Sequence, residues 1–183
     1  MAIQQPLPAG YEHPEHPSHE QAQLHPHSAS NVSPGQGEAL KIHNQAREAA
    51  TKQTSVHRPE LIWDSHLAAA AEEWAHYLAS RDAGLQHSTG AERPGQGENL
   101  YWTSAGGTLA DGSQCWVNER KMYHGEKIGQ GNFESYGHYT QVIWPSTTHV
   151  GVAMAKTRNG ANFIVGRYSG PGNYTGVSAY TGH

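Results

Sequence analysis

Two histidines and two glutamates are the residues of this sequence whose types suit metal chemistry. His87 stands in the segment LQHSTG, Glu98 in GQGENL, Glu119 in WVNER and His138 in YGHYTQ. Neutral imidazole nitrogens combined with anionic carboxylate oxygens suit a borderline divalent cation such as zinc. Because the four residues lie far apart along the chain, their spacing alone does not show that they meet in the folded protein.

Each of the four residues also has an ordinary structural explanation. His87 can cover the end of a helix, and His138 can be a hydrogen-bonded core histidine. Glu98 can accept hydrogen bonds from loop amides. Glu119, one helical turn from Trp116, can pair with a lysine on a solvated face. From the residues alone, a metal site and these four separate roles both stay open.

Other motifs that carry chemistry are missing from the sequence. It contains no P-loop, no G-x-G-x-x-G, no H-E-x-x-H, no G-x-S-x-G and no C-x-x-C. Its one cysteine, Cys115, excludes an intramolecular disulfide. Cys115 lies in the middle of a predicted helix without a base beside it in sequence, so we expect a buried, unreactive thiol.

The elements that must position these residues are predicted as helices first and strands last. A rough apolar stripe begins in GEALKIHNQAREAA, and a clearer one runs through residues 57–82, where Asp64 or Ser65 can cap the helix. A third helix is expected over residues 109–123, although Gly112 weakens its first turn. Residues 149–156 and 162–169 read as strands joined by an Asn-Gly hairpin turn. This order predicts an α+β domain with helices packed on an antiparallel sheet.

The N-terminal segment differs in composition from the rest of the chain. Residues 1–37 hold six of the ten prolines and five of the fourteen histidines, with almost no large apolar side chain. Such a segment cannot bury enough surface to offset the entropy of ordering, so we predict a disordered His/Pro-rich tail at 1–37 and one domain at 38–183. The His-Pro repeats of the tail can bind metal ions weakly.

Charge and hydropathy exclude several classes of protein. The formal net charge is −4, and Glu12, Glu15, Glu20 and Glu38, which precede the first basic residue, account for all of it. Without a basic patch, a nucleic-acid partner is not expected. No apolar run has transmembrane length. The first ten residues lack the basic and apolar regions of a signal peptide. Either the protein is not exported by the usual route, which favours a cytoplasmic location, or the sequence is a processed fragment with an added Met.

Five motifs in the right order resemble the CAP superfamily of cysteine-rich secretory, antigen 5 and pathogenesis-related proteins. They are GHYTQVIW followed by HVGVAMA, GQGENLYW, HSTGAERPGQGENL, WVNERKMY and RYSGPGNYTG, within a match from about Glu38 to Gly176. The resemblance implies the CAP (SCP) fold, a three-layer α-β-α sandwich with a small antiparallel sheet, and an extracellular location. HSTGAERPGQGENLYWTS looks most like the cysteine-poor Golgi-associated plant-pathogenesis-related branch. The glycine that is myristoylated in that branch is absent here, where Ala2 follows Met1.

The resemblance assigns roles to the four candidate site residues. His87 and His138 match the histidines that would ligate zinc or another divalent cation, loosely and with open positions for water. Glu98 and Glu119 would accept hydrogen bonds from the ring N–H groups or from metal-bound water. Ser104 matches a serine proposed in the Golgi-associated branch to form a Ser-His-Glu arrangement across a dimer. Asn173 matches a Gly-Asn motif for which a turn is a sufficient explanation.

The resemblance favours a binding protein that recognises a lipid, either a sterol or a fatty acid, or another hydrophobic ligand. The corresponding sterol loop would lie between Tyr123 and Tyr136, with Tyr123, Phe133 and Tyr136 as the contacts. One alternative is a metal-dependent hydrolase in which Glu98 or Glu119 acts as general base toward a zinc-bound water. The other alternative is a self-associating interaction module, for example a homodimer.

Overall fold

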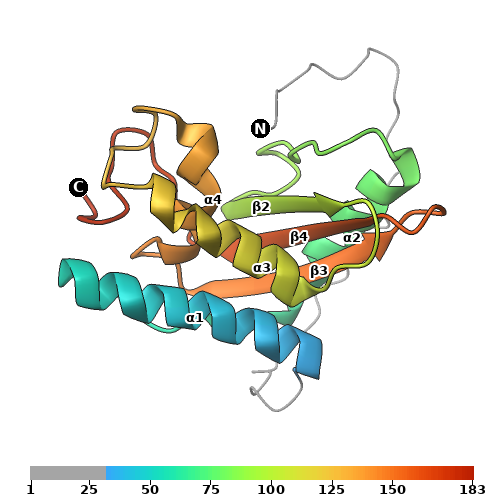
Figure 1. The fold of residues 1–183 in the computed structure, drawn as a ribbon, viewed down its shortest axis with the longest axis horizontal. Helices are drawn as coiled ribbons and strands as arrows, with labels where there is room; N and C mark the ends of the chain where they lie inside the picture. The colour runs from blue at the N-terminus through green and yellow to red at the C-terminus, as the bar shows by residue number, and fades with distance from the viewer. Residues whose placement is uncertain (1–31) are drawn as a thin grey trace.

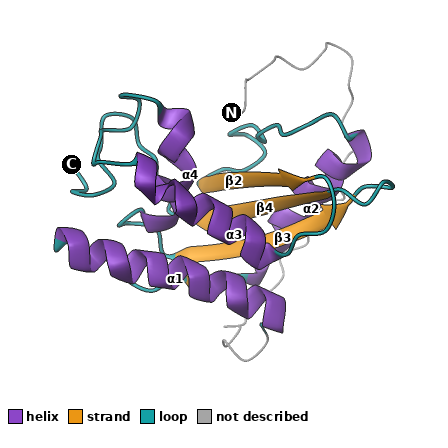
Figure 2. Cartoon of the chain, viewed as in Figure 1, coloured by secondary structure: helices purple, strands orange, loops and turns teal. Residues whose placement is uncertain are grey.

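The computed structural model describes residues 32–183, which fold into three layers (Figure 1, Figure 2). The helices are α1 (Pro34–Thr54), α2 (Ser65–Arg81), α3 (Leu109–Asn118), the short 3₁₀ helix η2 (Glu119–Met122) and α4 (Phe133–Ile143). The strands are β1 (Ile62–Trp63), β2 (Gln96–Thr103), β3 (His149–Lys156) and β4 (Asn162–Ser169). Within residues 32–183, no helix has the length and apolar character needed to cross a membrane.

One mixed sheet forms the middle layer, with the strand order β1-β3-β4-β2. Helix α2 packs on one face against β3 and β4, and α1, α3 and α4 lie over the opposite face (Figure 1). This arrangement confirms the predicted α+β class and the α-β-α sandwich. The sheet is not wholly antiparallel, because the two-residue strand β1 pairs with β3 in parallel. The other two pairings, β2 with β4 and β3 with β4, are antiparallel.

Helix α1 begins earlier than the sequence analysis predicts. The Ser33 side chain accepts from the Gln36 amide while the Gln36 side chain accepts from the Ser33 amide, and Pro34 occupies the first helical position. Helix α1 therefore begins four residues before the predicted domain start at Glu38. The remainder of the predicted tail, residues 1–31, lies outside the described part of the chain.

Helix α2 lies unusually close to the sheet. The Asp64 carboxylate caps the helix by accepting from the amides of His66 and Leu67. Asp64 was one of the two residues predicted as the cap. On β3, a Cβ atom added to Gly151 would lie 2.1 Å from the backbone nitrogen of Ala68 in α2. The absence of a side chain at Gly151 therefore permits this close approach of helix and strand.

Two elements that carry site residues were not predicted. Strand β2 was not expected, and α4 begins at Phe133, inside the segment interpreted as a ligand loop. Two buried guanidinium groups from outside α4 donate hydrogen bonds to the carbonyls at the C-terminal end of this helix. Arg47 donates to the carbonyls of Val142 and Trp144, and Arg58 donates to that of Ile143. These contacts fix the position of α4 against α1 and the chain that follows it.

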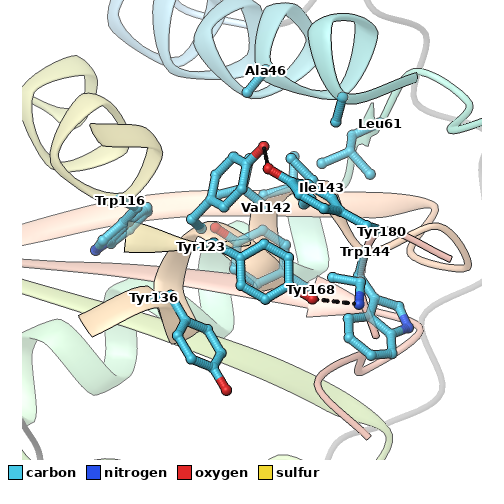
Figure 3. Packing of buried hydrophobic residues seen from close by; sticks show 14 of the residues in the cluster. Ala46, Leu61, Trp116, Tyr123, Tyr136, Val142, Ile143, Trp144, Tyr168 and Tyr180 are labelled. Carbon is cyan, nitrogen blue, oxygen red and sulfur yellow. Dashed lines mark hydrogen bonds between the residues drawn. The ribbon is translucent and has the colours of Figure 1, made fainter. Parts of the chain in front are cut away.

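The sheet has a core on each face. The core under α2 contains Trp74, Leu78, Leu100, Phe163 and Val165. The core under the other helices is rich in aromatic rings, including Trp116, Tyr123, Tyr136, Tyr139, Tyr168 and Tyr180 (Figure 3). The polar edges of these rings find partners inside the protein, as when the Trp116 indole N–H donates to the Leu100 carbonyl at 3.0 Å. This aromatic layer supports α4 and η2, the elements that carry His138 and Glu119.

Candidate functional site

The first of two histidine–glutamate pairs joins the loop after α2 to strand β2. Nδ1 of His87 lies 2.7 Å from Oε1 of Glu98. The same carboxylate accepts from the backbone amide and the hydroxyl of Ser88, at 3.0 and 2.6 Å, and from Nε of Arg167 at 2.8 Å. The Glu98 side chain is fully buried, whereas that of His87 is 32% exposed. Glu98 is therefore a fixed anchor and His87 is the accessible member of the pair.

The charge state of Glu98 follows from these contacts. Burial alone would raise the pKa of the Glu98 carboxyl, because it penalises the charged form. The hydrogen bond from His87, the charge of Arg167 and the hydrogen bond from Ser88 outweigh burial and hold the pKa below its ordinary value. Glu98 is therefore ionised at neutral pH and acts only as an acceptor.

The second pair joins α4 to η2. Nδ1 of His138 lies 2.7 Å from Oε2 of Glu119, and the other carboxylate oxygen accepts from the backbone amides of His138 and Tyr139 at 2.9 and 3.2 Å. The side chains of His138 and Glu119 are 28% and 20% exposed. As in the first pair, a carboxylate from a neighbouring element fixes the ring of a partly exposed histidine.

Both histidines line one cleft with two lobes. The first lobe has a volume of about 230 Å³ and is lined by Leu85, His87, Glu98, Asn99, Leu100, Phe133, Glu134, Gly137, His138 and Asn173. A second lobe of about 400 Å³ shares His87, Glu98, Phe133 and Asn173 with the first. The structure thus brings three of the four predicted residues to one cavity, and Glu119 supports His138 from behind it.

The hydrogen bonds determine which ring nitrogens are available. Because an ionised carboxylate only accepts, Nδ1 of His87 carries a proton and donates to Glu98, and the contact of His138 with Glu119 has the same form. Within residues 32–183, Nε2 of each ring has no hydrogen-bond partner. Its lone pair is therefore available next to the cleft. Among the described residues, no three His, Cys, Asp or Glu side chains are grouped closely enough to hold a metal ion. The chain therefore offers two protein nitrogens.

The predicted ligand loop is wrong for two of its three contact residues. Tyr123 and Tyr136 are 3% and 1% exposed and belong to the aromatic core (Figure 3). The hydroxyl of Tyr136 donates to the Gln130 carbonyl, and that of Tyr123 donates to the Glu126 carbonyl. Their aromatic rings stabilise the fold and cannot contact a ligand. Phe133 is 38% exposed and lines both lobes of the cleft.

The other residues considered in the sequence are Ser104, Cys115 and Asn173, and each lies in a different part of the fold. Ser104 is exposed beyond the end of β2 and lines neither lobe. Cys115 is exposed rather than buried as predicted. Partial burial and the nearby charge of Glu119 raise the pKa of the Cys115 thiol, which disfavours the reactive thiolate. Asn173 accepts from the Thr140 hydroxyl and donates to the Gly137 carbonyl, so it clamps the loop after β4 to α4 at the cleft.

The residues that hold Glu98 in place were not predicted from the sequence. Ser88 and Arg167 each contact this carboxylate, and Arg167 also donates to the Ser88 hydroxyl at 3.1 Å. Glu98 and Arg167 face each other across the antiparallel strands β2 and β4. An opposite-charge pair at facing positions was a readable signal. It required recognising β2 as a strand, which the sequence analysis did not do.

The fold and the cleft define a class of protein: an α-β-α sandwich in which two histidine–carboxylate pairs face one cavity. The profile of the cysteine-rich secretory protein family, CAP, matches residues 40–168. The chain therefore belongs to the CAP family.

Individual relatives agree with this assignment. Pathogenesis-related protein 1C of Nicotiana tabacum is 36% identical over 146 residues, which cover 79% of this chain and 80% of that protein. The human Golgi-associated plant pathogenesis-related protein 1 is 32% identical over 141 residues, covering 76% and 89%. These identities do not single out the Golgi-associated branch, to which the sequence motifs look most similar.

A solved structure confirms the fold independently. The crystal structure of NaASP2 with Zn²⁺ superimposes with a TM-score of 0.68 over 85% of this chain and 90% of that one, at 21% identity. At this level of identity the likeness establishes the fold alone.

Proposed function

We propose that this protein is a CAP-domain binding protein whose cleft holds a divalent cation of the zinc type and, beside it, part of a lipid or another hydrophobic ligand. The observation that carries the proposal is the pair of histidines that line one cavity, each with Nδ1 fixed by a carboxylate. Carboxylate partners of this kind fix the tautomer and orientation of metal-binding imidazoles.

The residues present fit a loosely held cation. Nε2 of His87 and Nε2 of His138 would be the two protein ligands, and Glu98 and Glu119 would keep the rings in the metal-binding tautomer. A bound zinc ion would supply positive charge and open coordination positions for a polar group of a ligand. Zinc is the first cation to test because the relative NaASP2 was crystallised with it.

The size and lining of the first lobe limit what it can accept. Its volume of about 230 Å³ is below the range of roughly 300–1,000 Å³ that is usual for sites enclosing a drug-sized ligand. Leu85, Leu100 and Phe133 contribute apolar surface to its lining, next to its polar groups. We therefore infer that the first lobe receives one end of an amphipathic molecule rather than a whole sterol.

The hydrolase alternative finds less support in the contacts. A general base needs a carboxylate oxygen that is free to take a proton from the attacking water. The two oxygens of Glu98 already accept from four donors, and those of Glu119 accept from three. Both carboxylates are therefore engaged in positioning histidines and backbone. The turnover of generic esters or peptides, lost in Glu119→Gln with zinc still bound, would reverse this ranking.

The metal proposal is tested by calorimetric zinc titration of the full chain. We expect one site of micromolar or tighter affinity that is lost in both His87→Ala and His138→Ala. His76→Ala is the matched control, because His76 is an exposed histidine on α2 beside Glu72 and lies away from the cleft. The tail histidines contribute equally to all four proteins. Equal zinc binding by wild type and both cleft variants would refute the metal site.

The hydrophobic-ligand part is tested separately with a fluorescent fatty-acid analogue. We expect Phe133→Ala to weaken binding and Met154→Ala, which truncates an exposed side chain on β3, to leave it unchanged. If both variants bind the fatty-acid analogue equally well, the cleft is not the site of the hydrophobic ligand. Self-association stays a separate prediction, which light scattering on the eluting protein measures directly.

The location of the protein is proposed from its family. The family is described as secretory, so we propose an extracellular location, with a cytoplasmic one as the alternative. Fractionation of cells that express the native gene tests this directly. Protein found only in the soluble cell fraction would favour the cytoplasmic alternative.

A further inference from the structure

The second lobe of the cleft is built differently from the first. It adjoins the histidine pair but extends toward the start of β2 and the loop after β4. Its additional lining residues are Arg93, Gln96, Gly97, Gln141, Pro171 and Gly172. Three of these six residues carry side chains with nitrogen donors, and none of the six has a role in the proposed metal site.

Gln141 is the most unusual residue of this lobe. It lies on α4, is 2% exposed, and its amide nitrogen has no hydrogen-bond partner among residues 32–183. The backbone closes around it on two sides: an added Cβ at Gly97 would lie 2.4 Å from Oε1 of Gln141, and one at Gly172 would lie 3.0 Å from Nε2. An amide donor enclosed in this way is unfavourable unless an acceptor is supplied.

The charge of the lobe indicates what kind of acceptor fits. Arg93 donates through Nε to the Ser88 carbonyl and through Nη1 to the Gln96 carbonyl, at 3.2 and 2.8 Å. No described residue accepts from its Nη2. The Glu98 carboxylate, which also lines the lobe, is already balanced by Arg167 at 2.8 Å. The Arg93 guanidinium is therefore a cation at the lobe from which no described carboxylate accepts a hydrogen bond.

We propose that the second lobe is a binding site for the carboxylate group of a small-molecule ligand, held by the Gln141 amide and the Arg93 guanidinium. An ionised carboxylate only accepts hydrogen bonds, which matches the unpaired Gln141 amide nitrogen and Nη2 of Arg93 as donors. Its negative charge is attracted by the Arg93 guanidinium, and its planar shape suits an arginine fork. Phosphate shares this chemistry but carries more charge.

Neither Gln141 nor Arg93 is a ligand of the proposed metal, although His87 also lines this lobe, so the test is made without metal. Acetate is titrated into the full chain in EDTA, and the amide signals of Gly97, Gly172 and the Gln141 side chain are followed by NMR. We expect saturable shifts with acetate and none with acetamide, which has the same shape without the charge. Shifts that do not saturate, or equal shifts with acetamide, would overturn the proposal. Tighter binding of inorganic phosphate would overturn the choice of carboxylate.

Variants separate binding from folding. Arg93→Gln should abolish the saturable shifts, and Arg158→Gln, which removes an exposed arginine in the β3–β4 turn, should leave them unchanged. Because Arg93 also holds the chain between Ser88 and Gln96, Gln141→Met provides an independent variant. It removes the unpaired amide while keeping the shape, so we expect an equal or higher Tm together with loss of the acetate response at Gly97 and Gly172. A lower Tm with an intact acetate response would contradict the proposal.

Discussion

At the scale of single residues, Glu98 combines full burial with a full negative charge. Its carboxylate joins β2 to Arg167 on β4 and to Ser88 and His87 in the loop after α2. Glu119 fixes the ring of His138 in the same way, but its carboxylate accepts from backbone amides where Glu98 accepts from an arginine. The two pairs therefore have the same geometry, but removing the negative charge of the carboxylate should cost different amounts of stability in each.

This difference predicts unequal effects of removing each charge. Glu98→Gln leaves Arg167, whose side chain is 4% exposed, without its counter-charge, so we expect a loss of roughly 3 kcal/mol in the free energy of unfolding. Glu119→Gln should cost less, because its side chain is 20% exposed and pairs with no arginine. Urea unfolding of both variants measures the difference. Equal losses would mean that the Glu98–Arg167 pair contributes nothing specific.

His43 predicts a pH dependence of stability that is unrelated to the cleft. Its ring is fully buried: Nδ1 donates to the Ala39 carbonyl and Nε2 accepts from the Tyr168 hydroxyl, both at 2.8 Å. Burial lowers the pKa of His43 from 6.5 to about 4. Below pH 6.5 the unfolded chain therefore takes up a proton that the folded protein refuses. Stability should fall as the pH drops from 6.5 toward 4, by roughly 3 kcal/mol in total.

The measurement is the free energy of unfolding of wild type and His43→Gln across this pH range. The variant is expected to be less stable at pH 7 but to lose the His43 part of the pH slope, while all other titrating groups contribute equally to both proteins. Parallel curves would show that His43 is protonated as easily in the folded protein as in the unfolded chain.

At the scale of elements, the sequence predicted those whose signals are local. Helix α2 has its cap at Asp64 and an apolar stripe at helical spacing, and the β3–β4 hairpin has Gly160 in its turn with φ of 87°. Strand β2 contains Gly97, Glu98 and Asn99, types that are depleted in strands because they pack poorly on a sheet. They occur there because they line the cleft or hold its residues, which local propensity does not reveal.

Helix α4 was unpredictable for a related reason. Its sequence holds Gly137 and β-branched residues, and it has no side-chain cap at its start. It is held by Glu119 at its middle and by Arg47 and Arg58 at its end, and all three come from other elements. Tertiary contacts therefore override weak helix propensity here. Packing in the aromatic core buries Tyr136, which the family resemblance placed in a ligand loop.

The close packing of α2 on β3 gives a prediction about two glycines. Gly151→Ala would place Cβ 2.1 Å from the Ala68 nitrogen, where the neighbouring atoms are backbone and cannot move aside cheaply. We expect a loss of roughly 2–3 kcal/mol in the free energy of unfolding. Gly35→Ala, in the first turn of α1 with open space around it, should be neutral or stabilising by up to about 1 kcal/mol. Tolerance of Gly151→Ala would mean that α2 can shift on the sheet.

At the scale of the whole molecule, the site exists only because the sandwich brings four segments together. His87 follows α2, Glu98 lies on β2, Glu119 begins η2 and His138 lies on α4. Spacing along the chain could not predict this convergence, and only the family resemblance did. The buried partners of Glu98 were predicted neither by spacing nor by the resemblance, because Arg167 depends on the register of β2 against β4 and Ser88 on the path of the loop after α2.

The charge of the whole chain predicts weak attraction to anionic membranes. The twelve Lys and Arg and twelve of the sixteen Asp and Glu lie from Lys41 onward, which leaves this part formally neutral and the whole chain at −4. Polybasic segments gain about 1 kcal/mol for each Lys or Arg near an anionic surface, and this chain has no such excess. We therefore expect the same bound fraction in sedimentation with phosphatidylcholine vesicles and with vesicles that also contain phosphatidylserine, at low and at high salt.

A variant with reversed charges provides the matched control for the vesicle experiment. Glu60→Lys combined with Glu72→Lys changes two exposed residues and moves the formal net charge from −4 to 0. This variant should bind phosphatidylserine vesicles better than wild type at low salt, and the difference should disappear at high salt because the surface charges are screened. Strong, salt-sensitive binding by wild type would instead reveal a local basic surface that the formal charge conceals. The membrane itself, rather than a free ligand in the cleft, would then become the first partner to consider.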